Sequence, residues 1–292
     1  MNAGLETRLR EAGLDPQAVD NIVRVALAED GGRDVTSEPI FGDDARASAD
    51  VVARQPGVVA GVPVAEVVFT SIGDHRGDVE VVSRVADGSR VVAGDVLLSV
   101  EGPLVPLLRA ERTALNFLTH LSGIATVTGE WVDAIAGTKA RVRDTRKTLP
   151  GLRALQKYAV RCGGGVNHRM SLSDAALIKD NHVAAAGSLT AAFDAVRAPA
   201  LHVEVECDTL EQVREVLDAG ASSILLDNMT IAEMAEAVRF TRGRAELEAS
   251  GGLGLDGARD VAETGVDYLA VGALTHSAPA LDIGLDLSGA AS

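Results

Sequence analysis

The sequence of 292 residues contains few aromatic side chains and few cysteines, and it has a deficit of positive charge. Phe, Trp and Tyr make up 3% of the residues and the formal net charge is −15. This composition lacks the basic surface and stacking rings that nucleic-acid-binding proteins use. The two cysteines, Cys162 and Cys207, provide neither a disulfide framework nor the ligand spacing of a metal site, so we expect buried free thiols.

Long hydrophobic runs are absent as well. The longest uncharged segment, 113–129, contains Thr, Asn, His, Ser and Gly and is a poor membrane span. Residues 1–15 lack the continuous apolar stretch of a signal peptide. We therefore expect a soluble, cytoplasmic protein that binds neither membranes nor nucleic acid.

The positive charge that is present is concentrated in residues 139–179. This basic segment contains all four lysines and six arginines, opposed only by Asp144 and Asp174, so it carries +8 while the rest of the chain carries −23. A basic region on an acidic body attracts small anions to one place. The charge distribution therefore predicts a site for small polyanions.

The first third of the chain predicts a small separate domain. Asp15 and Pro16 are typical of a helix start, apolar residues follow at helical spacing, and a glycine pair at 31–32 ends the helix. Valine-rich segments broken by Gly and Asp predict strands at Ala47–Ala53, Val79–Val85 and Val91–Val100. Residues 107–135 predict one or two helices, with Gly123 and Gly129 as the expected breaks.

From residue 140 onward, strands and helices alternate regularly. The predicted strands start 22 to 35 residues apart, at Ala140–Arg143, Ala175–Ile178, Leu201–Cys207, Ser223–Leu226, Ala245–Ala249 and Tyr268–Val271. Helical patterns such as Leu210–Ala219 and Ile231–Phe240 lie between them. This repeat predicts parallel strands that form a doubly wound sheet or a barrel. Because every strand is followed by polar or glycine-rich residues, which a barrel gathers into one mouth, we favour the barrel.

A glycine-rich turn follows the fifth of these strands. Gly252, Gly254 and Gly257 form a literal G-x-G-x-x-G, but no acidic residue closes the next strand to hold a dinucleotide ribose. We favour a cradle for one phosphate, built from Ser250, Gly251 and Gly252 with Gly272 and Ala273 one unit later. A purely structural turn is the alternative.

Cationic and acidic side chains also follow the predicted strands. Thr145, Arg146 and Lys147 come after the first strand, and adjacent Arg and Lys can bind carboxylates and diphosphates. A solvated basic loop is the alternative. On the third strand Glu204 and Glu206 share a face, and Asp227 ends the fourth. These carboxylates could be Mg²⁺ ligands, an acid–base pair or acceptors for sugar hydroxyls, and Glu204 could instead pair with a basic neighbour.

Three sequence stretches together resemble the quinolinate phosphoribosyltransferase family. They are Asp144-Thr-Arg-Lys-Thr-Leu-Pro-Gly-Leu-Arg153, Gly163-Gly-Gly-Val-Asn-His-Arg169 and Ile178-Lys-Asp-Asn-His182. The similarity extends from Glu29-Asp-Gly-Gly-Arg-Asp-Val-Thr-Ser37 to Val271-Gly-Ala-Leu-Thr-His276. It implies an α/β fold with an N-terminal α/β sandwich domain, 1–116 joined by the tail 276–292, and an incomplete, open α/β barrel of the TIM type, 117–275.

The resemblance also implies an activity and a set of site residues. The expected enzyme is a pentosyltransferase that converts quinolinate and 5-phosphoribosyl-1-diphosphate into nicotinate mononucleotide, diphosphate and CO₂ in NAD biosynthesis. Mg²⁺ would arrive with the diphosphate, without direct protein ligands. The chain would form a homodimer or a higher oligomer. The implied quinolinate-binding residues are Arg146, His168, Arg169 and Lys179, with Arg112 from the partner subunit. Lys147 would join Lys179 at the diphosphate, and the ribose would be held by Glu206 and Asp227. The 5′-phosphate would be held by Ser250, Gly251, Gly252, Gly272 and Ala273. The expected catalytic residues are Lys147, Glu206 and Asp227.

Two other functions remain open at this point. A related phosphoribosyltransferase could act on nicotinate or another small ring acid, including relatives linked to molybdenum transport, but a monoacid needs fewer cations than this sequence supplies. A non-catalytic sensor of phosphorylated metabolites would not need Glu206 and Asp227. We also expect Lys139, Arg141, Lys157 and Arg161 to be solvated residues without a function.

Overall fold

The computed structural model describes residues 1–73, 76–198 and 201–291, which divide into two compact units. The first unit comprises Met1–Val127, Leu149–Gly164 and Ser277–Ser292, and the second comprises Thr128–Thr148 and Gly165–His276. The fold is the predicted combination of an N-terminal α/β unit with an antiparallel sheet and a second unit with six parallel strands. The domain boundaries drawn from the sequence stay a prediction.

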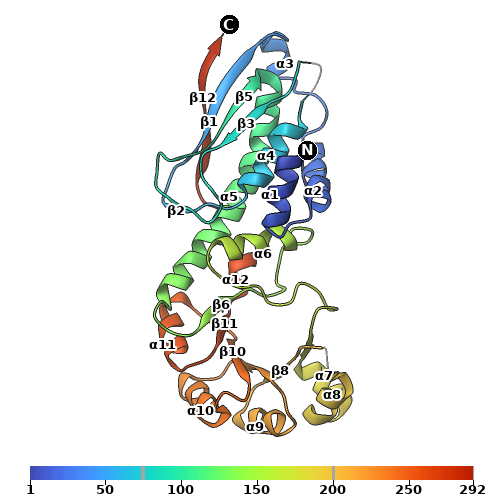
Figure 1. Ribbon diagram of the computed structural model, residues 1–292, viewed down its shortest axis with the longest axis vertical. Coiled ribbons are helices and arrows are strands. Elements are labelled where there is room, and N and C mark those ends of the chain that lie inside the picture. The colour runs from blue at the N-terminus through green and yellow to red at the C-terminus, as the bar shows by residue number, and fades with distance from the viewer. Residues whose placement is uncertain (74–75, 199–200, 292) are drawn as a thin grey trace. The chain divides into compact units, whose positions relative to one another are not determined.

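An antiparallel sheet in the order β12-β1-β5-β3 organises the first unit. Its strands are β1 (Arg46–Ala53), β3 (Glu80–Ser83), β5 (Val96–Pro103) and β12 (Ile283–Ala291). The chain's last strand, β12, therefore pairs with its first, as Figure 1 shows. Helix α4 (Val62–Ser71) packs on β3 and β5, and α1 (Ala3–Glu11) and α2 (Pro16–Glu29) pack on α4.

Local chemistry explains most of these boundaries. Asp15 accepts a hydrogen bond from the Gln17 N–H, and Pro16 occupies the first turn of α2, as predicted. The single strand predicted at Val91–Val100 is wrong. Gly94, at φ 97°, and the Asp95 carboxylate, which accepts from the Val92 N–H, form a turn between β4 (Arg90–Val91) and β5. Strand β4 pairs with β2 (Gly57–Val58) in a separate small sheet.

One continuous helix, α5 (Leu104–Ala134), replaces the two breaks predicted at Gly123 and Gly129. Gly123 has a packing role instead. A Cβ at this position would lie 2.0 Å from the backbone oxygen of Pro279, so the glycine lets the C-terminal segment cross the helix closely. The remaining helices of the unit are α3 (Ser37–Ile40) and α6 (Arg153–Cys162).

Six parallel strands form the sheet of the second unit, in the order β6-β11-β10-β9-β8-β7. They match the predicted strands closely: β6 (Arg141–Arg143), β7 (Ala176–Ile178), β8 (Val203–Cys207), β9 (Ser223–Asp227), β10 (Glu246–Ser250) and β11 (Tyr268–Ala270). Because the last strand, β11, pairs back with β6, the sheet rolls up and leaves its opening between the edge strands β6 and β7. This is the incomplete barrel that the sequence predicts.

Helices follow five of these strands, β7 to β11, along the chain. They are α7 (Asp180–Ala186), α8 (Leu189–Val196), α9 (Leu210–Asp218), α10 (Ile231–Thr241), α11 (Ala258–Glu263) and α12 (Ala273–His276). At the open edge, the Val166 N–H donates to the Val142 oxygen at 2.9 Å and the Asp144 N–H donates to the Val166 oxygen at 3.1 Å. These bonds place the segment that carries His168 and Arg169 beside β6. No helix in the described ranges has the length and apolar character needed to cross a bilayer.

Candidate active site

A pocket of about 390 Å³ lies at the carboxyl ends of the barrel strands. Its wall combines residues that lie in or directly after all six strands of this sheet, because the carboxyl ends of parallel strands meet at one edge of a sheet. The lining residues are Thr145, Arg146, Lys147, His168, Arg169, Leu177, Lys179, Glu206, Leu225, Asp227, Glu248, Ser250 and Ala270. The basic segment and the acidic strand ends therefore meet in one cavity, which we call the anion pocket.

Two arginines of the anion pocket lie close enough to repel each other. Burial lowers the pKa of Arg169, and the positive charge of Arg146 lowers it further. One amino group of Arg169 donates to the Ala175 oxygen at 2.7 Å. Within the described part of the chain, the buried Nε of Arg146 has no hydrogen-bond partner. Two crowded guanidinium groups, each with several N–H donors, are suited to a ligand with more than one carboxylate.

Lys147 packs against the end of the barrel. Its backbone N–H donates to the Thr145 hydroxyl at 3.0 Å, and its backbone oxygen accepts from the Thr275 hydroxyl at 2.8 Å. A Cβ at Gly272 would lie 2.9 Å from the Lys147 side chain, so the glycine makes room for it. Ala273 begins α12 directly after this contact. The loops after β6 and β11 are thereby joined.

Both strand-end carboxylates are engaged within the pocket. The Lys179 ammonium forms an ion pair with Glu206. Asp227 accepts a hydrogen bond from the side-chain amide of Asn228 at 2.6 Å, and Asn228 adopts a left-handed backbone at φ 54°. The glycine-rich turn lies beside Asn228, because the Asn228 N–H donates to the Ser250 oxygen at 3.0 Å. Gly251 and Gly252 have φ values of 91° and 59°, which only glycine adopts readily.

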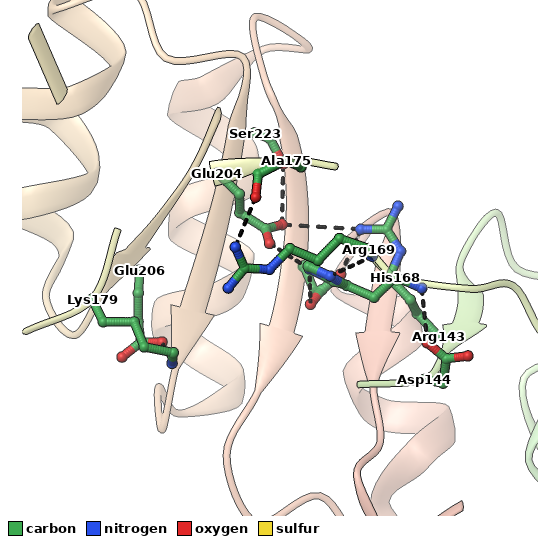
Figure 2. A network of polar contacts seen from close by, with 10 residues as sticks. Arg143, Asp144, His168, Arg169, Ala175, Lys179, Glu204, Glu206 and Ser223 are labelled. Carbon is green, nitrogen blue, oxygen red and sulfur yellow. Dashed lines mark hydrogen bonds and ion pairs between the residues drawn. The ribbon is translucent and has the colours of Figure 1, made fainter. Parts of the chain in front are cut away.

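A polar network that includes two pocket-lining residues connects β6, β8, β9 and β10 with the segment of His168 (Figure 2). Its members are Arg143, His168, Glu204, Ser223 and Glu248. Arg143 donates to Glu248 at 2.6 Å and stacks 3.4 Å above the centroid of the Tyr268 ring. His168 Nε2 lies 2.7 Å from Glu204, so the alternative that Glu204 pairs with a basic neighbour is confirmed. Sequence analysis missed Arg143 and Glu248. The signal was weak, because each shares its short strand with a second charged residue that is exposed, Arg141 in β6 and Glu246 in β10.

His168, Glu204 and Glu248 offer ligand atoms within 4.8 Å of one another, a spacing compatible with a metal ion. The charge balance favours a different arrangement. Arg143 lies 2.6 Å from Glu248 and 3.9 Å from Glu204 and already offsets part of the negative charge of the cluster. We therefore assign this trio to the protein's own ion-pair network.

Comparison with known proteins identifies the family. The family model described as "Quinolinate phosphoribosyl transferase, N-terminal domain" matches residues 34–122, and the model for the C-terminal domain matches residues 124–286. The chain belongs to the quinolinate phosphoribosyl transferase family. A relative from Mycobacterium leprae, named nicotinate-nucleotide pyrophosphorylase [carboxylating], is 54% identical over 277 residues, which cover 92% of this chain and 97% of the relative.

Other members of the family agree with this assignment. A tobacco relative named quinolinate phosphoribosyltransferase [decarboxylating] 2b, mitochondrial, is 38% identical and covers 96% of this chain and 87% of its own length. The crystal structure of NadC from Streptococcus pyogenes superposes with a TM-score of 0.89 at 40% identity, covering 94% of this chain and 99% of that chain. The resemblance stated from the sequence motifs is confirmed.

The remaining basic residues of this phosphoribosyltransferase lie apart from the anion pocket's lining. Arg112, the residue expected to enter a partner subunit, is exposed on α5 and lines a cavity of about 630 Å³ in the first unit, together with Phe117 and His120. Lys139 pairs with Asp267 at 2.7 Å. The expectation that Lys157 is solvated is wrong, since its side chain is fully buried.

Proposed function

We propose that the anion pocket is the active site at which this quinolinate phosphoribosyltransferase joins quinolinate to 5-phosphoribosyl-1-diphosphate. The observation that carries the proposal is the composition of one cavity. Arg146, Lys147, Arg169 and Lys179 share it with Glu206, Asp227 and Ser250. A dicarboxylate, a diphosphate, a ribose and a phosphate need these groups together: cations for the anions, carboxylates for the sugar hydroxyls and a glycine-rich turn for the phosphate.

The cations of the first loops would hold quinolinate. Arg146 and Arg169 repel each other, and a dianion between them relieves that repulsion. Lys179 and His168 complete the predicted set. The assignment explains the choice of a diacid, because a ring with one carboxylate would leave part of this positive charge uncompensated.

The opposite wall would hold the phosphoribosyl group. Glu206 and Asp227 accept hydrogen bonds from the ribose hydroxyls, and Ser250, Gly251 and Gly252 bind the 5′-phosphate with Gly272 and Ala273. Lys147 and Lys179 contact the diphosphate. Lys179 must then exchange its ion pair with Glu206 for substrate contacts, which frees Glu206 for the ribose. The internal ion pair therefore keeps both groups in place before the substrates arrive.

The reaction needs no covalent nucleophile from the protein. The bond between the anomeric carbon and the diphosphate oxygen breaks, and its electron pair leaves with the diphosphate. The carboxylates of Glu206 and Asp227 stabilise the resulting ribosyl cation, and the ring nitrogen of quinolinate supplies the electron pair of the new bond. The carboxylate next to the ring nitrogen then departs as CO₂ and leaves the electron pair of the broken bond on the ring carbon. The pyridinium stabilises this electron pair, and a proton takes the place of the carboxylate at that carbon.

Magnesium and a second subunit are part of the proposal. Mg²⁺ bound to the diphosphate would neutralise negative charge on the leaving group. No side chain of the pocket is assigned as its direct ligand, although Glu206 and Asp227 offer the hard oxygen atoms it prefers. The chain forms a homodimer in which Arg112 contacts quinolinate in the neighbouring site. A cytoplasmic location fits the two free thiols, Cys162 and Cys207.

A comparison of two ring acids tests the proposal. The purified protein is mixed with 5-phosphoribosyl-1-diphosphate and Mg²⁺, and either quinolinate or nicotinate is added. We expect nicotinate mononucleotide from quinolinate and at least about a hundredfold lower kcat/KM with nicotinate, because one lost charged contact costs roughly 2–3 kcal/mol. Turnover of nicotinate but not of quinolinate would contradict the assignment and favour the related monoacid enzyme.

A further inference from the structure

Both ring nitrogens of His168 are engaged inside the protein. Nδ1 lies 2.8 Å from the backbone N–H of Arg169, and Nε2 lies 2.7 Å from a carboxylate oxygen of Glu204. A nitrogen that accepts a hydrogen bond from an N–H carries no proton of its own, so the ring proton resides on Nε2 and is donated to Glu204. In this arrangement the ring presents no further N–H to a ligand.

Glu204 is held as an ionised carboxylate. Its side chain is 1% exposed, and the Ser223 hydroxyl donates to its other oxygen at 3.1 Å. Burial on its own would raise the pKa of Glu204, but the hydrogen bond from His168, the charge of Arg143 and the Ser223 hydroxyl outweigh it and lower that pKa. Figure 2 shows Glu204 between these partners.

The second buried glutamate of the network, Glu248, is held differently. Only one of its oxygens accepts from Arg143, while the other has no hydrogen-bond partner among the described residues. Burial and the neighbouring charge of Glu204 raise the pKa of Glu248 to about 7. At mildly acidic pH Glu248 is therefore protonated and carries no charge. The positive charge of Arg143 then balances the one remaining negative charge, that of Glu204.

The network ends on Arg169, which the repulsion of Arg146 would otherwise push away. His168 Nδ1 accepts a hydrogen bond from the backbone N–H of Arg169. The Asp144 carboxylate in turn accepts one from the backbone N–H of His168 at 2.8 Å. Asp144 directly precedes the loop of Arg146. The same hydrogen-bonded chain therefore fixes the backbone from which Arg169 extends, next to the start of the Arg146 loop, and preorganised charges bind a dianion without first having to be ordered.

We propose that Glu204 is a positioning residue that acts through His168 to hold Arg169 beside Arg146 for binding of the ring dicarboxylate. The identity of that dicarboxylate as quinolinate rests on the proposed function. Glu204 itself does not touch the substrate. The role of His168 is then to connect Glu204 with Arg169, in addition to any contact it makes with a ligand.

Two isosteric substitutions test the proposal. In Glu204→Gln the amide oxygen can still accept from the His168 N–H and the NH₂ can donate to the Ser223 hydroxyl, but the negative charge that strengthens the bond to His168 is lost. In Glu246→Gln, on β10 and outside the lining of the anion pocket, the exposed amide oxygen can still accept from the Tyr268 hydroxyl at 3.3 Å. At about pH 6 we expect Glu204→Gln to raise the KM for quinolinate about tenfold, with little change in the KM for phosphoribosyl diphosphate.

Glu246→Gln is the matched control. We expect its KM for quinolinate to remain within about threefold of that of the unmodified protein, with a similar melting temperature. A merely structural role of Glu204 would instead lower the melting temperature and impair both substrates alike. Equal effects of the two substitutions, or equal effects of Glu204→Gln on the two KM values, would overturn the proposal.

A measurement on the substrate-free protein separates this proposal from the assignment of the substrate. ¹⁵N NMR of the histidine rings reports which nitrogen carries the proton. We expect the Nε2–H form of His168, and a shifted Arg169 backbone amide signal in Glu204→Gln. A proton on Nδ1, or an unchanged Arg169 signal in the variant, would refute the positioning role even if quinolinate is turned over. If both signals behave as expected but quinolinate is not a substrate, only the proposed function fails.

Discussion

At the scale of single residues, the anion pocket depends on side chains whose neighbours compensate for their crowding. The segment of Arg169 is held beside Asp144, which precedes the loop of Arg146, because Asp144 accepts from the His168 N–H and His168 Nδ1 accepts from the Arg169 N–H. Sequence analysis could place Arg146, Lys179, Glu206 and Asp227 in one mouth, because each follows a strand of the same parallel sheet. It could not find the network of Arg143 and Glu248, because the partners of a buried charge depend on which strands become neighbours.

Gly251 is the residue at which the ribose and phosphate subsites are predicted to meet. It has a φ of 91°, and a Cβ there would lie 2.2 Å from the side-chain oxygen of Asn228, the residue that binds Asp227. We expect Gly251→Ala to displace both the turn and Asp227. The KM for phosphoribosyl diphosphate should rise at least about tenfold and kcat should fall, since the strain alone costs about 1–3 kcal/mol.

Gly254→Ala provides the control in the same turn. Gly254 has a φ of −104° and no neighbouring atom within 4 Å of a Cβ, so alanine fits there. Its kinetic constants should be close to those of the unmodified protein. If Gly251→Ala were equally harmless in steady-state assays, the glycine-rich turn would have no role in holding the phosphate.

At the scale of elements, the sequence predicts the parallel strands well and the long helix poorly. The strands of the barrel are short apolar runs that end at polar residues, and this pattern is local. The breaks predicted in α5 are wrong because a glycine in a helix indicates a break only when nothing packs against it. Position 123 requires a glycine because the segment around Pro279, more than 150 residues later in the sequence, crosses the helix there.

The packing of α5 predicts an unusual response to alanine. In an exposed helix interior, replacing glycine by alanine stabilises a protein by about 1 kcal/mol. Gly123→Ala should instead lower the melting temperature by several degrees, because the new methyl group would overlap the Pro279 oxygen, 2.0 Å away. Gly4→Ala in α1, where the nearest atom is 3.5 Å from the Cβ, should leave the melting temperature unchanged or raise it. A stabilising Gly123→Ala would show that the tail does not pack on the helix as described.

At the scale of the whole molecule, the charge distribution and the predicted dimer belong together. The anion pocket draws its cations from the second unit, whereas Arg112 belongs to the first. The charge of the basic segment 139–179 is enough to indicate a polyanion site, but composition carries no signal for a residue supplied by another subunit. That part of the site is implied only by the resemblance to the family.

Subunit mixing tests the shared site. Arg112→Ala and Lys147→Ala should each be nearly inactive alone. In a mixed dimer, one of the two sites combines an intact Arg112 with an intact Lys147. After random exchange of subunits in equal amounts, activity should therefore recover to about a quarter of that of the unmodified protein. Persistent inactivity, when exchange is demonstrated with tagged subunits, would exclude Arg112 from the neighbouring site.

The coupling of phosphoribosyl transfer to loss of one carboxylate is the central claim, and isotope stoichiometry tests it most directly. The unmodified protein is given phosphoribosyl diphosphate, Mg²⁺ and quinolinate labelled in the carboxylate next to the ring nitrogen. We predict labelled CO₂, unlabelled nicotinate mononucleotide and diphosphate in equal amounts. Labelled CO₂ released without nucleotide, or label retained in the nucleotide product, would contradict the account.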